Sequence, residues 1–167
     1  MNQPSWPIAE FDPVRRLRVL AAAAPGATIH ERVLAARLEQ VWAVAADLEG
    51  ELAQWLFPDI RTVRLTYPTE PEQAVATVIG YSGLRARFDV VLQPGWCLMQ
   101  SRFLIGGMAA TPEPPYDGGT RFAFLGGFRG PLRPMALLTR PLANPAGRHA
   151  LDRFTERVEQ RTASHDS

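Results

Sequence analysis

The chain has very few of the residues that build covalent or metal-bound sites. Among its 167 residues there are one cysteine, Cys97, and three histidines. A single cysteine excludes an internal disulfide and any site with several thiolate ligands. Because Cys97 stands between apolar residues, we interpret it as a buried, inert thiol. His30, His149 and His165 are widely separated and have no partner at ligand spacing, so we predict no metal site and no cofactor.

Long apolar runs and an excess of one charge are also missing. The apolar run 19–24 is too short for a secretory signal, and nothing approaches the ~18 apolar residues of a membrane span. The net charge is +1, and the arginines are scattered among acids, which argues against a dedicated nucleic-acid or anionic-membrane binder. We therefore expect a cytoplasmic protein with no nucleic-acid partner and no integral membrane segment.

Both ends of the chain carry helical patterns. Near the C-terminus, Leu151, Phe154 and Val158 recur every three or four residues, and charged residues occupy the other positions. This predicts an amphipathic helix over 146–162 that packs on other elements. Between residues 8 and 24 we predict a short helix, with Asp12 as its N-cap and Pro13 at its first position.

The region between these ends reads mainly as strands. Alternating apolar and polar residues predict strands over 28–35, 60–67, 73–81, 84–93, 96–105, 108–111 and 120–128. Helical spacing over 37–56, with a break at Gly50, predicts two short helices after the first strand. In the clearest strand, Phe88 and Val90 face one way and Asp89 faces the other. Strands joined by hairpins and separate helices indicate an α+β fold with an antiparallel sheet.

Two glycine pairs interrupt this pattern. We expect Gly106-Gly107 to bend the chain. Gly126-Gly127 lies within the last strand, which indicates either a bulge or the close approach of another element.

The order of elements resembles a known superfamily. The segment IHERVLAARLEQVWAVAADLEGELAQWLFPDI, with Val41-Trp42 on a helix followed by Asp47-Leu48, is similar to START-like helix-grip proteins. This superfamily, also called SRPBCC, includes polyketide cyclase/dehydrase-like and lipid-transfer proteins. The resemblance continues to LDRFTERVE and covers 28–162. It implies a curved antiparallel β-sheet wrapped around a long C-terminal α-helix, with an apolar cavity between them.

The N-terminal helix is extra to the minimal family pattern. We therefore divide the chain into an N-terminal arm and helix (1–27), a helix-grip domain (28–162) and a disordered tail (163–167). The N-terminal helix could pack on its own domain or reach a second subunit, which leaves a homodimer open.

No catalytic motif is present, and we assign no catalytic residue. His30, Asp89 and Tyr81 are the only candidates for a general base, and none has a recognisable partner. Arg102 could bind a ligand carboxylate, although its position in the strand predicts a surface residue. The residues that could line the cavity are mostly apolar, and the same side chains could fill an ordinary core. They are Tyr81, Phe88, Val90, Met99, Ser101, Phe103, Phe122, Phe124, Leu151 and Phe154.

Three hypotheses for function follow. The first is binding or transport of a hydrophobic small molecule, which is lipid- or polyketide-like if the resemblance holds. The second is an enzyme of the polyketide cyclase/dehydrase type, which would need a base poised near neutral pH. The third is a protein-interaction module without a small ligand.

Overall fold

The computed structural model describes residues 12–50, 60–68, 72–113 and 118–165. Three α-helices, one short 3-10 helix and seven strands are described in these ranges. In chain order they are α1 (Pro13–Ala23), β1 (Thr28–Leu34), α2 (Leu38–Ala45), β2 (Ile60–Thr66), β3 (Gln73–Gly80), β4 (Arg85–Gln93), β5 (Trp96–Gln100), β6 (Leu104–Pro112), β7 (Thr120–Phe128), η1 (Gly130–Leu132) and α4 (Met135–His165).

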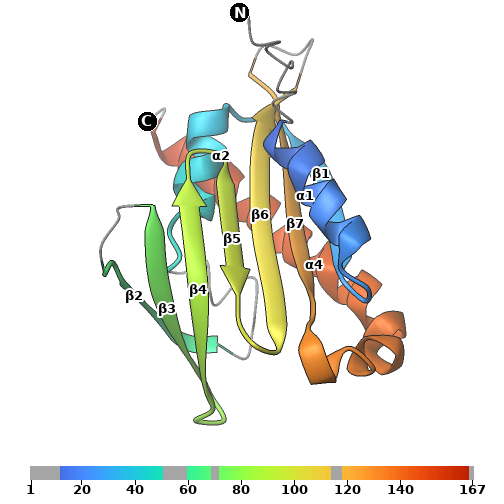
Figure 1. The fold of residues 1–167 in the computed structure, drawn as a ribbon. Coiled ribbons are helices and arrows are strands. Elements are labelled where there is room, and N and C mark those ends of the chain that lie inside the picture. The colour runs from blue at the N-terminus through green and yellow to red at the C-terminus, as the bar shows by residue number, and fades with distance from the viewer. Residues whose placement is uncertain (1–11, 51–59, 69–71, 114–117, 166–167) are drawn as a thin grey trace, which may run out of the picture.

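The seven strands form one antiparallel sheet in the order β1-β7-β6-β5-β4-β3-β2. Consecutive hairpins connect β2 to β7, and β1 then pairs along the last strand, with Thr28 opposite Gly126 and Leu34 opposite Thr120. In Figure 1, α4 runs behind this sheet and α1 lies in front of it. The predicted α+β helix-grip architecture is therefore confirmed.

The concave face of the sheet packs against α4 and α2. Leu151, Phe154 and Val158 of α4 are at most 3% exposed, which confirms that they form one buried face. The rings of Phe122 on β7 and Phe154 stack with centroids 4.1 Å apart. On the β1 edge, Arg32 donates to Asp152 Oδ1 at 2.6 Å. The most extensive contacts of α4 with other elements are those with β1, β7 and α2.

The opposite, outer face has its own apolar core under α1. The helix begins as predicted, because Asp12 Oδ1 accepts a hydrogen bond from the backbone N–H of Arg15 at 3.0 Å. Leu17 is fully buried against the sheet, together with Val14. The Arg18 guanidinium makes two 2.6 Å hydrogen bonds to the Glu31 carboxylate on β1. The sequence leaves open whether this helix packs on its own domain or reaches a second subunit, and in the structure α1 packs on its own domain.

The structure corrects one predicted strand. The segment 96–105 is not a single strand, because the chain turns between β5 and β6. Ser101 Oγ accepts hydrogen bonds from the backbone N–H groups of Phe103 and Leu104, at 3.2 and 2.9 Å. This serine stabilises a turn that has no glycine or proline to mark it. Gly106 and Gly107 consequently lie inside β6 rather than at a bend.

Three other predictions compare as follows. The second helix expected within 37–56 falls mostly in 51–59, outside the described residues. Helical structure in α4 starts earlier than expected, continues through Pro145 and reaches into the segment assigned to a tail. At Gly127 the close approach is confirmed and the bulge is wrong: its register is unbroken, and a Cβ there would lie 2.7 Å from Ala27 Cα.

Candidate functional site

The concave face carries both fully buried and partly buried side chains. Ala76, Val90 and Cys97, which belong to the core formed with α2 and α4, are at most 2% exposed. Toward the lower end, the inward-facing side chains are only partly buried. We call these residues the lower concave face: Val78, Phe88, Met99, Phe124 and Gly126.

A pair of glycines removes side chains from the same region. Gly106 on β6 lies directly opposite Gly126 on β7, and both face the concave side. A Cβ added to Gly126 would have no atom of the described residues within 4 Å. A Cβ on Gly106 would make an ordinary contact with the methyl group of Met99, at 3.5 Å. Among the described residues, nothing therefore covers this apolar part of the sheet at Gly126.

Two polar side chains of β1 border this space: Thr28 pairs with Gly126 and its hydroxyl donates to Gly126 O at 3.4 Å, and His30 follows two residues later. It lies on β1 opposite Phe124, and the two rings stack with centroids 5.3 Å apart. Its Nε2 is buried and has no hydrogen-bond partner among the described residues. The backbone of α4 passes close by at Gly147, where a Cβ would collide with the imidazole. Burial, and secondarily the positive charge of Arg148, lower the pKa of His30 below 6.5.

The other titratable candidates do not join His30. Asp89 is exposed on the outer face of β4, and Tyr81 lies in the β3–β4 turn with 69% of its surface exposed. Cys97 is buried, and burial raises its thiol pKa to about 12, so it is no nucleophile at neutral pH. No group of three or more metal-binding side chains occurs in the described ranges.

The ten residues named from the sequence separate into two groups. Seven lie together on or above the concave face: Phe88, Val90, Met99, Phe122, Phe124, Leu151 and Phe154. The other three, Tyr81, Ser101 and Phe103, lie in turns at the lower end of the sheet. Ser101 holds the β5–β6 turn, and the Arg102 guanidinium lies 5.3 Å from the ring centroid of exposed Phe103.

Sequence reasoning did not place Gly126 on the concave face, and it named His30 as a candidate base without assigning it to that face. Gly126 is separated from Phe122 and Phe124 by an even number of residues, so it faces the same side of the strand as they do. This spacing is the signal that could have placed it on the concave face. His30 faces the same side of β1 as Leu34. Its neighbours Ile29 and Glu31, one apolar and one acidic, share the other side, so the pattern does not show which side faces the core. Its burial depends on α4, which is distant in the sequence.

A hollow lies on the outer face of the sheet, over β3, β4 and β5. It has a volume of about 360 Å³ and is lined by Pro68, Gln73, Ala74, Val75, Asp89, Val90, Val91, Leu98 and Gln100. The hollow is open to solvent and combines Asp89 with amide side chains from the neighbouring strands. It offers polar contacts without an enclosed volume.

No helix within the described ranges combines the length and the apolar character needed to cross a membrane. No family model matches the chain, and no curated protein is similar to it at a significant level.

Solved structures, in contrast, are similar over most of its length. A START superfamily protein from Mycobacterium smegmatis is 20% identical, with 80% of this chain and 97% of that chain covered and a TM-score of 0.54. The Zhui aromatase/cyclase from a Streptomyces species is 16% identical, with coverages of 81% and 94% and a TM-score of 0.57. Norcoclaurine synthase from Thalictrum flavum, solved with dopamine and hydroxybenzaldehyde, is 13% identical, with coverages of 80% and 86% and a TM-score of 0.53.

At these identities the similarity concerns the fold. The seven-stranded curved sheet, the long C-terminal helix behind it and the three matched structures agree on one architecture. The chain has the helix-grip fold of START-like and polyketide cyclase-like proteins.

Proposed function

We propose that the protein binds or transports a hydrophobic small molecule, lipid- or polyketide-like, between the sheet and α4. The observation that carries this proposal is the space that the described residues leave open at Gly126 on an apolar concave face. Ligand sites are mostly apolar and have few polar groups, and His30 supplies one such group at the edge of this space. The unbranched side chain of Met99 provides an adaptable wall.

The lining that we propose includes the residues predicted from the sequence. Phe88, Met99 and Phe124 form the partly covered part of the wall, and Val90, Phe122, Leu151 and Phe154 form its buried end. Tyr81, Ser101 and Phe103 are proposed to border the entrance from the turns. The matched aromatase/cyclase and the synthase crystallised with two aromatic molecules support an aromatic or polyketide-like ligand.

Native mass spectrometry of the purified protein tests this function directly. We expect a noncovalent mass that disappears on denaturation and can be extracted into organic solvent. If the protein is isolated bare, aromatic polyketides and fatty acids are added in a thermal-shift assay. A ligand present at 100 times its Kd stabilises the folded state by about 2.7 kcal/mol.

A matched pair of variants locates the binding site. Gly126→Leu places a side chain in the open space and should abolish the ligand-induced shift while the protein stays folded. Thr77→Leu adds the same side chain to the exposed outer face of β3 and should leave the shift unchanged. A bare mass together with no stabilisation by any compound would refute the proposal.

A second candidate function is catalysis of a polyketide cyclisation, favoured by the unpartnered Nε2 of His30. The neutral imidazole would take a proton from a carbon of the polyketide substrate that lies beside a carbonyl. The resulting carbanion would attack a second carbonyl of the same substrate molecule. It ranks second because Nε2 is sealed from solvent against α4 at Gly147. His30→Gln should abolish turnover of a poly-β-ketone substrate but retain its binding; unchanged turnover would exclude this role.

A further inference from the structure

Exposed apolar side chains gather at one end of the molecule. Leu137 and Leu138, in the first turns of α4, are 74% and 72% exposed. The neighbouring Ala136 is buried against Gly26 in the α1–β1 turn, so this contact orients the helix start and turns the leucines outward. The other members of this set lie in the β3–β4 turn, the β5–β6 turn, η1 or the start of α4: Tyr81, Leu84, Phe103, Leu132 and Met135.

These segments lie along the lower edge of the sheet in Figure 1. The antiparallel order places the end of β3, the start of β4, the end of β5, the start of β6 and the end of β7 at the same edge. The backbone N–H of Arg129 donates to Phe103 O at 2.6 Å, which joins the β5–β6 turn to the segment leading into α4. We call this end the apolar end of the molecule.

Among the described residues of these turn segments, the charges have one sign. The sequence contains no acidic residue and five arginines between Asp117 and Asp152, and none of the segments 78–88, 98–106 and 124–139 contains an acid. Arg102 and Arg133 are exposed and form no ion pair with another described residue. Among the described residues, the Arg129 guanidinium donates to two neutral partners, Gln100 Oε1 and Ser101 O.

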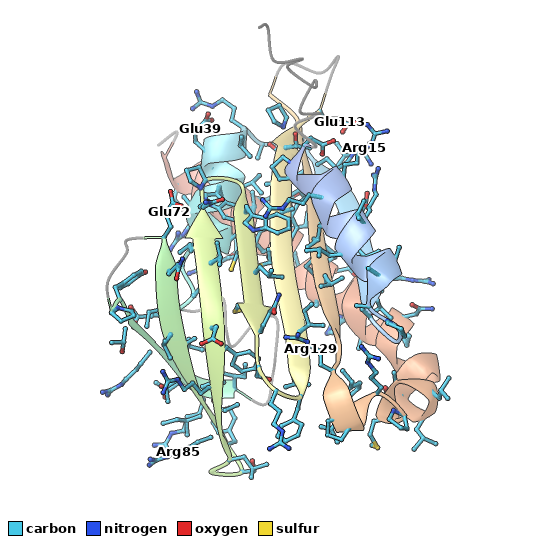
Figure 2. All side chains as sticks on the ribbon, viewed as in Figure 1. Arg15, Glu39, Glu72, Arg85, Glu113 and Arg129 are labelled. Atoms are coloured by element: carbon cyan, nitrogen blue, oxygen red, sulfur yellow. The ribbon has the colours of Figure 1, made fainter. Side chains whose placement is uncertain are left out.

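Several acidic residues lie at the other end. Figure 2 shows Glu39, Glu72 and Glu113 at the upper end of the molecule, where Arg15 also lies, and Arg85 and Arg129 toward the lower end. The net charge of +1 therefore conceals a local excess of arginine among the described residues of the apolar end. A global charge count predicts no affinity for anionic surfaces, whereas the local arrangement provides a cationic rim around leucines.

We infer that the apolar end docks on a bilayer that contains anionic lipids. Exposed leucines and aromatic residues enter the region between headgroups and acyl chains, and surrounding arginines meet the negative surface potential. A nucleic acid would use the arginines but would leave two adjacent leucines in water. The lower concave face is least covered at this same end, so a hydrophobic ligand could pass directly between bilayer and protein. The docking itself does not rest on the proposed ligand function.

Flotation of the full chain with lipid vesicles tests this inference. We expect binding to vesicles that combine phosphatidylcholine with phosphatidylglycerol, much weaker binding to phosphatidylcholine alone, and loss of binding as salt is added. Leu137→Glu with Leu138→Glu should weaken binding at least tenfold, because it removes apolar area and adds repulsion. Val33→Glu is the matched control: Val33 is also exposed, but it lies near the opposite end of the sheet.

The arginines are tested separately. Arg102→Gln with Arg133→Gln should weaken binding about fivefold for each charge removed, the equivalent of about 1 kcal/mol. Arg64→Gln, on the exposed outer side of β2, should have no effect. Thermal melting of each variant confirms that it is folded.

Several results would overturn the inference. These are absence of flotation with anionic vesicles, equal binding to both vesicle types at all salt concentrations, or variants that bind like the natural protein. A dimer in solution that dissociates on Leu137→Glu with Leu138→Glu would instead assign the apolar end to a second copy of this chain. Binding to single-stranded or duplex nucleic acid that survives the leucine changes would assign it to that partner. Ligand stabilisation is measured without vesicles, so failure of one proposal is distinguishable from failure of the other.

Discussion

Two adjacent glycines of β7 should respond in opposite ways to the same substitution. Gly126 faces the concave side, where a new Cβ would meet no described atom within 4 Å. Gly127 faces the outer side, where a new Cβ would lie 2.7 Å from Ala27 Cα and 2.9 Å from its Cβ. Neither glycine has a positive φ, so an alanine can adopt either backbone conformation without strain.

The difference between the two variants isolates the steric effect. In the interior of a strand, alanine is favoured over glycine by about 0.5–1 kcal/mol, and this gain applies equally to both positions. Gly126→Ala should therefore raise the free energy of unfolding by about that amount. Gly127→Ala brings carbons closer than the ~3.5–4.0 Å of an optimal contact, and the obstacle is backbone rather than a movable side chain. Overpacking of this kind costs about 1–3 kcal/mol.

The propensity gain cancels in the comparison, so Gly127→Ala should be less stable than Gly126→Ala by about 1–3 kcal/mol. For a domain of this size that corresponds to a difference in Tm of about 2–12 °C, at roughly 2–4 °C per kcal/mol. Urea denaturation followed by circular dichroism measures both free energies, and equal m-values confirm that the same unfolding transition is compared. Equal stabilities, or a less stable Gly126→Ala, would show that position 126 is not open.

Two further predictions concern α1 and the buried histidine. Leu17→Ala should lower the free energy of unfolding by about 2–5 kcal/mol, because the side chain is fully buried, whereas exposed Val19→Ala should change it by less than about 0.5 kcal/mol. Similar effects in urea denaturation, or a separate early transition, would show that α1 is not part of the cooperative fold. The lowered pKa of His30 means that the unfolded chain takes up this proton first as the pH falls. Stability should therefore decrease below about pH 6.5, and His30→Phe should reduce this decrease; identical profiles in denaturation experiments at pH 5, 6 and 7 would contradict it.

The fold could be predicted from the sequence because its signals are local and regular. Phe88 and Val90 alternate with charged neighbours, and Leu151, Phe154 and Val158 recur at helical spacing, so the inner faces of β4 and α4 are readable directly. The turn at Ser101 could not be read this way, because a serine hydroxyl replaces the glycine or proline that usually marks such a turn.

The candidate site was only partly predictable for a related reason. Large apolar side chains identify the concave face, but the space above it arises where side chains are missing. A glycine in a strand is equally compatible with a bulge, a close contact or a gap. Gly127 makes a close contact, and the adjacent Gly126 leaves a gap among the described residues. Their difference depends on Ala27, nearly a hundred residues earlier in the chain, which no local pattern includes.

The β5–β6 turn at Ser101 explains why the apolar end could not be predicted from the sequence. A continuous strand over 96–105 would carry Phe103 on the face of Met99 and Arg102 on the other, so neither residue would signal an exposed edge. Because the chain turns at Ser101, both lie at the lower edge of the sheet, beside the start of α4. A polypeptide with a net charge of +1 can thus present a cationic, apolar surface once antiparallel pairing gathers acid-free turns at one edge. The net charge of the whole chain is therefore not enough to exclude association with an anionic surface. The charges at each edge of the sheet have to be counted separately.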